Sequence, residues 1–195
     1  ITKTQIVYPN PSITLDGATV CQYSNLQLTP IVTGGTPAYS HLWSNNTQIL
    51  STPTTDQNAT INTSDNLNTY YLTYKVTDAN SCIASKDVTV VINPQPKVSA
   101  SVDKTVSCVG EDVQLTGTVT SGSTSGTVKH EWISANASDL TSTSIPNPKL
   151  NSYVSGALSF QYKFTDANGC SATSNTVTVQ NYPNPTVTIN DVPDQ

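Results

Sequence analysis

The sequence predicts an all-β protein made of two tandem β-sandwich domains, and three observations support this prediction. The segment Asp78–Cys82 reappears as Asp166–Cys170 with one residue changed, and His41-Leu42-Trp43 reappears as His130-Glu131-Trp132. The offsets between equivalent residues are 87 to 89, in a chain of 195 residues. Short runs in which β-branched and aromatic residues alternate with polar ones are typical of half-buried strands. A period of this size indicates two copies of one small domain.

Pro-rich junctions separate the predicted domains. Tyr8-Pro9-Asn10-Pro11, Asn93-Pro94-Gln95-Pro96 and Tyr182-Pro183-Asn184-Pro185 each precede an alternating stretch. Because proline fixes φ and lacks an amide donor, we expect semi-rigid connections between neighbouring domains in a longer array. The assignments are residues 1–8 as the end of a preceding domain or the start of the segment, 9–93 and 94–182 as the two domains, and 183–195 as the first strand of a following domain.

Individual strands follow from the alternation of apolar side chains. Inward faces are predicted at Tyr70, Leu72, Tyr74 and Val76 in the first copy and at Leu158, Phe160, Tyr162 and Phe164 in the second. Further strands are predicted at residues 12–15, 88–90, 97–102, 113–119, 128–133, 177–179 and 186–189, with short edge strands and loops at 44–67 and 134–156. The last strands align one residue out of step, so a β-bulge is expected between Cys170 and Val177.

Composition argues against several classes of function. The net charge is −5, the isoelectric point is about 4.6, and all eight basic residues are lysine, so the arginine forks that grip nucleic acid are absent. The longest apolar run, Val88–Ile92, is too short to cross a membrane. We find no Gly-X-Ser-X-Gly elbow, HExxH helix or phosphate loop. The sequence therefore predicts a protein that is not an enzyme, needs no cofactor and does not insert into membranes.

The segments Gly34–Asn45 and Thr77–Cys82 resemble the PKD-like and SprB-type repeats of bacterial surface proteins. The resemblance departs from the usual pattern at His41 and Ser81, and the second copy lacks the Gly-Gly-Thr-Pro lead-in. Such repeats are immunoglobulin-like β-sandwich modules of gliding adhesins and extracellular polysaccharide-degrading enzymes. The resemblance implies secretion or display at the cell surface, without implying one activity.

Four cysteines occupy equivalent positions in the two copies. Their placement favours a disulfide Cys21–Cys82 in the first domain and Cys108–Cys170 in the second, and hence an oxidising compartment. The early and late cysteines of one sandwich can lie at opposite ends, too far apart for a disulfide. Free thiols and a metal site remain the alternatives, although no CxxC spacing favours a metal.

His41 and His130 alternate with Trp43 and Trp132, so each imidazole is expected on the same sheet face as its indole. Two matching histidines invite a metal ligand or a catalytic base, but satisfied core residues explain them better, because an inward Trp is typical of such sandwiches. Asp78, Asn80, Asp166 and Asn168 offer oxygens for calcium. Turn formation by Asp and Asn explains them equally, and we predict no metal.

Two classes of function remain. The first is a structural one, in which the domains are spacer or adhesin repeats whose partners are neighbouring modules or a protein ligand on a surface. The second is binding of polysaccharide through exposed aromatic side chains, for which Tyr71 and Tyr153 are the candidates, with Tyr23 and Tyr39 as weaker ones. We expect a monomer in either case.

Overall fold

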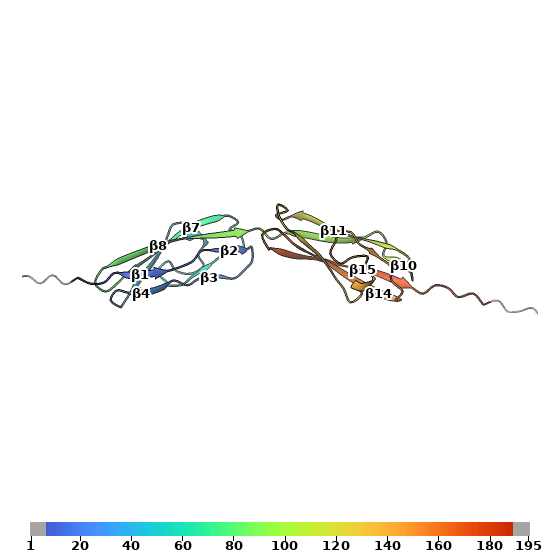
Figure 1. Cartoon of the computed structure of the whole chain (residues 1–195), viewed down its shortest axis with the longest axis horizontal. Coiled ribbons are helices and arrows are strands. Elements are labelled where there is room, and N and C mark those ends of the chain that lie inside the picture. Colours follow the sequence, from blue (N-terminus) through green and yellow to red (C-terminus); the bar gives the residue numbers. More distant parts are fainter. Residues whose placement is uncertain (1–6, 189–195) are drawn as a thin grey trace, which may run out of the picture. The chain divides into compact units, whose positions relative to one another are not determined.

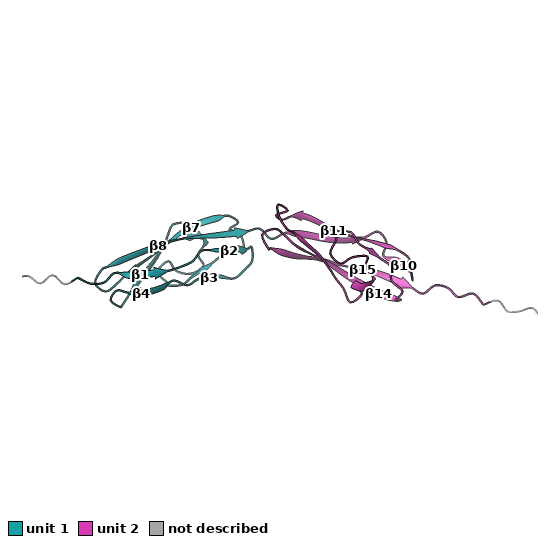
Figure 2. Cartoon of the chain, in the orientation of Figure 1, with its two compact units in different colours: residues 1–95 teal, residues 96–195 magenta. Residues whose placement is uncertain are grey.

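The structure is a computed structural model that describes residues 7–188 of the chain. It divides into two compact units, residues 1–95 and 96–195 (Figure 2). In the described part the regular elements are strands, apart from the three-residue 3-10 turns η1 (Thr47–Ile49) and η2 (Ala137–Asp139). The all-β prediction is therefore confirmed. The described residues include no helix of the length and hydropathy needed to cross a membrane.

Unit 1 is a sandwich of a four-stranded sheet and two two-stranded ribbons (Figure 1). The sheet has the order β2-β8-β7-β5, and its strands are β2 (Ala18–Cys21), β8 (Ile83–Asn93), β7 (Thr69–Thr77) and β5 (Ser40–Ser44). The ribbons pair β1 (Pro11–Thr14) with β4 (Ile31–Gly34), and β3 (Leu26–Leu28) with β6 (Ala59–Ile61). All pairs are antiparallel except β2 with β8, which is parallel.

Unit 2 repeats this plan. Its first sheet has the order β10-β15-β14-β12, with β10 (Val106–Cys108), β15 (Ser171–Tyr182), β14 (Gly156–Thr165) and β12 (Lys129–Ile133). Its second sheet has the order β13-β11-β9, with β13 (Lys149–Leu150), β11 (Val113–Ser121) and β9 (Lys97–Val102). The short strand β10 runs parallel to β15, as β2 does to β8. The two short parallel strands were not predicted from the sequence.

The alternation that predicts the strands also builds both cores. In β7 the side chains of Leu72, Tyr74 and Val76 are fully buried, and the neighbouring residues are less buried. In β14 the predicted inward set is buried throughout: Leu158, Phe160, Tyr162 and Phe164. Burying one large apolar side chain contributes about 1.5–3 kcal/mol to the free energy of folding. The strand β7 therefore supplies much of the stability of unit 1, and β14 supplies much of the stability of unit 2.

The predicted β-bulge lies in β15. Gln161 of β14 pairs with Thr176, but Lys163 pairs with Thr173, so β15 carries one extra residue between them. The Ser174 hydroxyl accepts the amide of Tyr162 at 2.9 Å. The Asn175 side chain turns to β9, where its Nδ2 donates to Ala100 O and its Oδ1 accepts from Ala100 N, each at 3.1 Å. The extra residue thus joins the two sheets of unit 2 by a pair of hydrogen bonds.

One position explains why unit 1 has two short strands where unit 2 has one long strand. At the repeat offset of 87, Pro30 between β3 and β4 corresponds to Gly117 in the middle of β11. The Gly117 amide donates to Pro146 O at 2.8 Å, and a proline has no amide to donate. Pro30 therefore interrupts the strand in unit 1.

Residues 186–189 were predicted to form a strand, and residues 186–188, which the structure describes, do not form one. Residues 186–188 are exposed and form no strand, because no described segment pairs with them. Residue 189 and the rest of the predicted following domain lie outside the described residues. The same holds for residues 1–6, which we assigned to a preceding domain.

Candidate functional site

A tight turn closes the hairpin between the last two long strands of each unit. In unit 1 the carboxylate of Asp78 accepts three backbone amides: Thr36 at 2.8 Å, Asn80 at 2.9 Å and Cys82 at 2.8 Å. In unit 2, Asp166 accepts the amides of Ser123, Asn168 and Cys170 at 3.1, 2.9 and 2.9 Å. The Asp78 and Asp166 carboxylates, which were weighed above as calcium ligands, thus already accept backbone amides, and these bonds hold the turn.

Glycines let a second loop approach this turn closely. Gly35 has φ +68°, and a β-carbon there would lie 3.1 Å from Asp78 Oδ2 and 3.2 Å from Pro11 Cβ. In unit 2, a β-carbon at Gly122, which has φ +134°, would lie 3.0 Å from Pro96 Cβ. The serine-rich loop of unit 2 therefore performs the task of the Gly-Gly-Thr-Pro segment, although the two sequences differ.

The Asp78 turn is predicted to make the stability of unit 1 sensitive to acid. The amide of Thr36, followed by those of Cys82 and Asn80, holds the pKa of Asp78 below its ordinary value. A carboxyl whose pKa is lowered by folding contributes stability above its unfolded pKa, and loses it as the pH falls through the folded value. We expect Asp78→Asn to destabilise unit 1 at neutral pH and to flatten its loss of stability as the pH falls below about 4.

Thermal unfolding of both proteins between pH 2 and pH 7 measures this effect. The exposed Asp65→Asn is the control, since Asp65 accepts only the neighbouring Ser64 hydroxyl among its described hydrogen bonds. Parallel pH curves for the parent chain and Asp78→Asn would contradict the assigned role.

A cluster of His, Tyr and Trp lies inside each unit. In unit 1, His41 Nδ1 and Tyr74 Oη are 2.6 Å apart, and the Tyr74 and Trp43 ring centroids are 4.9 Å apart. In unit 2, His130 Nδ1 and Tyr162 Oη are also 2.6 Å apart, with 5.3 Å between the Tyr162 and Trp132 centroids. Both indoles are buried, and both imidazoles are half-buried. We call these residues the His–Tyr–Trp clusters.

The polar atoms of the clusters bind the protein itself. Trp43 Nε1 donates to Asp56 O at 3.1 Å, and Trp132 Nε1 donates to Ile145 O at the same distance. Burial raises the pKa of Tyr74 and Tyr162, so both phenols stay protonated at neutral pH. A neutral phenol bonded to an imidazole is neither a nucleophile nor a strong base, and this arrangement serves packing.

The tyrosine hydroxyl of each cluster can be tested by removing it. Tyr74→Phe leaves His41 Nδ1 without this partner, and we expect unit 1 to lose about 1 kcal/mol. Urea-dependent hydrogen exchange of β7 measures the loss, with β14 of the same molecule as the internal reference. The exposed Tyr71→Phe on the same strand should change nothing. Equal protection in Tyr74→Phe and the parent chain would show that the hydrogen bond adds no stability.

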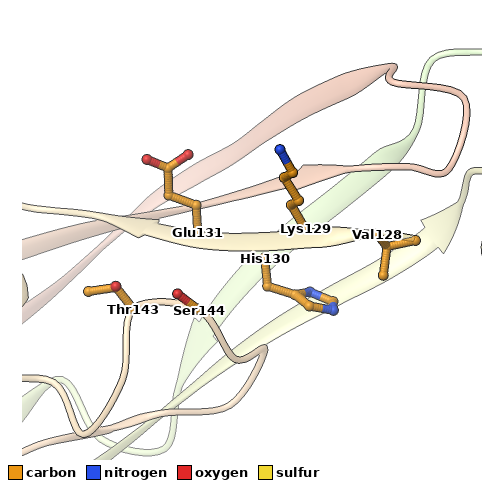
Figure 3. A pocket seen from close by; sticks show the side chains of 6 residues that line it. All are labelled: Val128, Lys129, His130, Glu131, Thr143 and Ser144. Carbon is orange, nitrogen blue, oxygen red and sulfur yellow. The ribbon is translucent and has the colours of Figure 1, made fainter.

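An open groove of about 460 Å³ lies beside His130 in unit 2 (Figure 3). His130 projects to the same side of β12 as Thr143 and Ser144, whereas Lys129 and Glu131 project to the other side (Figure 3). The hydrogen bond described for His130 goes to Tyr162 in the core, not to either hydroxyl. The groove thus does not assemble a nucleophile, a base and an orienting group.

The candidate carbohydrate-binding tyrosines are exposed but isolated. Tyr71 in β7 is 64% exposed, and Tyr153, in the loop between β13 and β14, is 78% exposed. They belong to different units and to non-equivalent positions of the repeat. Tyr23 is also exposed, while the Tyr39 hydroxyl is bonded to Gly34 O. None of the ring contacts found among residues 7–188 joins two of these tyrosines.

The predicted disulfide pairs are wrong. Cys21 and Cys170 are disulfide-bonded, whereas Cys82 and Cys108 are free thiols. In unit 1, Cys21 pairs with Asn93 at one end of β8, and Cys82 precedes Ile83 at the other end. That strand has eleven residues, so its ends are about 30 Å apart. A disulfide requires Cα atoms roughly 4.4–6.8 Å apart, and the early and late cysteines of one unit cannot meet.

Comparison with known proteins identifies the fold. No protein-family profile and no curated protein sequence matches the chain. The N-terminal eight Ig domains of Down Syndrome Cell Adhesion Molecule match 90% of this chain and 24% of theirs, with a TM-score of 0.60 and 14% identity. The fold is immunoglobulin-like. At this identity the likeness shows the fold of the Ig-like units and nothing about their function.

Two further solved structures match the chain with lower TM-scores. Sidekick-1 immunoglobulin domains 1–4 match over 94% of this chain and 51% of theirs, with a TM-score of 0.47 and 14% identity. The fibronectin(III)-like modules of Clostridium thermocellum CbhA match over 89% of this chain and 94% of theirs, with a TM-score of 0.43 and 14% identity. We draw no argument from either.

Proposed function

We propose that the chain consists of two tandem Ig-like modules of the PKD-like, SprB-type class. They act as non-catalytic, semi-rigid spacer or adhesin repeats of a large secreted or cell-surface bacterial protein. The motif resemblance at Gly34–Asn45 and Thr77–Cys82 supports the class. The disulfide at Cys21 and Cys170 supports an oxidising location outside the cytosol.

The main support is that the features shared by the two copies of the repeat face inward. The His–Tyr–Trp clusters and the Asp78 and Asp166 turns have the same partners in both units, and those partners are backbone groups or core side chains. A binding or catalytic site presents its defining side chains to solvent. Residues repeated for the sake of packing are expected in modules whose task is to hold a shape.

A spacer role predicts an extended monomer whose length depends on the junction at residues 93–96. Pro94 is exposed, so Pro94→Gly loosens the junction without disturbing either core. With the disulfide at Cys21 and Cys170 reduced in both proteins, small-angle scattering should give a longer maximum dimension and a narrower distribution of conformations for the parent chain than for Pro94→Gly. Sedimentation should show a monomer for both. Identical scattering curves, or a compact parent chain, would remove the support for a stiff spacer.

The alternative is a carbohydrate-binding module of an extracellular polysaccharide-degrading enzyme. The large exposed areas of Tyr71 and Tyr153 favour this alternative, because sugars stack on exposed aromatic rings. Isothermal titration against soluble polysaccharides and pull-down with insoluble ones, with and without calcium, distinguishes the two functions. Flat isotherms agree with the spacer. Saturable binding that is lost in Tyr71→Ala or Tyr153→Ala, but kept in Leu67→Ala, would replace the spacer with the carbohydrate module.

A further inference from the structure

The segment from the opening proline to the first cysteine is two residues shorter in unit 1 than in unit 2. Cys21 follows Pro11 by ten residues, and Cys108 follows Pro96 by twelve. This segment contains the first strand of each unit, which is β1 in unit 1 and β9 in unit 2. Unit 1 therefore lacks two residues at or just after its first strand.

The strand register shows that the two residues are missing after β1 has begun. Ile13 in β1 pairs with Val32, and Val98 in β9 pairs with Val119. The first members of these pairs each lie two residues after the opening proline, and the second members are related by the repeat offset of 87, so the two pairs are equivalent. Both strands thus start in the same register, but β1 ends at Thr14 whereas β9 continues.

Residues 101–102 of β9 have no equivalent in unit 1. Leu15 and Ala100 are both buried and precede the gap, and an aspartate follows the gap in both units. In unit 2, residues 101–102 pair with residues 115–116 of β11. The equivalents of residues 115–116 in unit 1 are residues 28–29, and β1 ends before it reaches them. Residues 28–29 therefore lack the cross-strand neighbours that their equivalents have.

A cleft of about 270 Å³ lies in unit 1 at the place of the missing residues. Two segments line it, residues 14–18 and residues 26–29, together with Ile31. Leu15 and Leu28 are buried, whereas Ile31 is 60% exposed. The cleft therefore has apolar side chains within reach of a ligand that enters it.

The backbone at the cleft is unpaired. In unit 2 the Asp103 amide donates to Gln114 O at 3.1 Å, and the Asp103 carboxylate accepts the Gln114 amide at 2.9 Å. No such bond joins Asp16 to Gln27 in the described part of unit 1. Within residues 7–188, no hydrogen bond is found for the amide or the carbonyl of Thr29. Unpaired backbone groups of this kind are a template for the addition of a strand.

We propose that this cleft binds an extended segment of a partner protein, which pairs with residues 28–29 and supplies the strand end that unit 1 lacks. The main-chain hydrogen bonds of an added strand give affinity, and a pocket for its side chain gives specificity. Unit 2 shows which side chain fits, because Val102 is half-buried there and packs against the core. The partner segment therefore has a β-branched apolar residue at this position.

The partner segment also carries a basic residue, because the cleft offers a carboxylate without a counter-charge. Asp16 lines the cleft, is exposed, and forms none of the ion pairs found in the described chain. The net charge of −5 adds to the attraction for a cation. The inference rests on the proposed role as an adhesin repeat, and it gives that role a partner of stated chemistry.

The probe is the peptide Ser-Ala-Ser-Val-Lys-Lys with blocked ends, which joins the sequence of residues 99–102 to two lysines. It is titrated into the whole chain, and the backbone amide shifts are followed by NMR. We expect saturable shifts at Asp16 and Thr29. The equivalent amides of unit 2, Asp103 and Thr116, should not move, because the chain itself already fills that position.

Two variants and a second peptide test the contacts separately. A chain with Ser-Val inserted between Leu15 and Asp16 supplies the strand end itself, and it should not bind the peptide. Asp16→Asn should weaken binding by about two- to fivefold, the contribution of an exposed ion pair. The peptide with glycine in place of valine has the same charge and should give no saturable shift.

A flat titration of the parent chain overturns the proposal, as do equal shifts at Thr116 or undiminished binding to the folded insertion variant. Unchanged amide shifts in β7 and β8 show that this variant is folded, and the glycine peptide gives the same test without any change to the protein. Shifts at Thr29 that depend on protein concentration without peptide would assign the cleft to a second copy of the chain and also overturn the proposal. Failure here leaves the spacer role standing, because the scattering of the chain without peptide tests that role.

Discussion

Replacing Trp43 by alanine is expected to destabilise unit 1 by about 3–5 kcal/mol while leaving unit 2 folded. The Trp43 indole is 1% exposed, packs on the Tyr74 ring and donates to the backbone of residues 56 and 57. Its removal therefore leaves a cavity and two carbonyls without their donor. For a module of this size the loss is a large part of the whole stability.

Each unit contains one tryptophan, which makes the measurement direct. In Trp43→Ala the remaining fluorescence comes from Trp132 in unit 2, while hydrogen exchange in β7 reports on unit 1. We expect an unchanged urea midpoint by fluorescence and a loss of protection in β7. The exposed Tyr71→Ala is the control on the same strand. If the urea midpoint measured by Trp132 fluorescence falls together with the hydrogen-exchange protection of β7, the two units unfold as one.

Gly117→Val is expected to destabilise unit 2 by about 1–3 kcal/mol or more. A β-carbon at Gly117 would lie 2.7 Å from the ring of Tyr162, which is fully buried and held by His130. At this distance either the Tyr162 ring or the backbone of β11 must shift, which disturbs the packing of the core. Because valine has a higher intrinsic strand propensity than glycine, propensity alone predicts that Gly117→Val stabilises unit 2.

Differential scanning calorimetry should show a lower unfolding temperature for unit 2, by roughly 4–8 °C per kcal/mol, with the unit 1 transition unchanged. The control is Thr118→Val at the next residue, which is exposed and lies on the other face of β11. If Gly117→Val proved as stable as Thr118→Val, the close packing of Tyr162 on β11 would be refuted.

Most strands could be predicted because their apolar residues alternate over long runs. The faces of β7 and β14 illustrate this, since several of the largest fully buried side chains, among them Tyr74, Phe160 and Tyr162, lie on them. The bulge in β15 could be predicted because two aligned copies differ by one residue, which is information that a single domain does not provide. The short parallel strands β2 and β10 were missed, because three or four residues give too little periodicity to reveal a partner.

The local environment of the candidate site residues could be predicted less well. That His41 and Trp43 share a sheet face follows from period 2, but the hydrogen bond to Tyr74 depends on the register between β5 and β7. Nothing local to His41 specifies that register. The cysteine pairing failed for a different reason: equivalence between repeats shows which residues correspond, and it does not show which ones meet. The position of Cys21 opposite the end of β8 supplies the missing information.

The difference between Pro30 and Gly117 bears on how the chain avoids misassembly. Tandem domains of similar sequence are prone to exchange strands while they fold, which traps misfolded species. The long strand β11 offers the Gly117 amide to Pro146, and the corresponding segment of unit 1 has a proline there and no amide. Conversely, a strand copied from unit 2 carries no break where unit 1 turns from β3 to β4. The difference between Pro30 and Gly117 makes these two related segments less alike in their backbone hydrogen bonding, and we expect it to disfavour exchange of the strands between the two sandwiches.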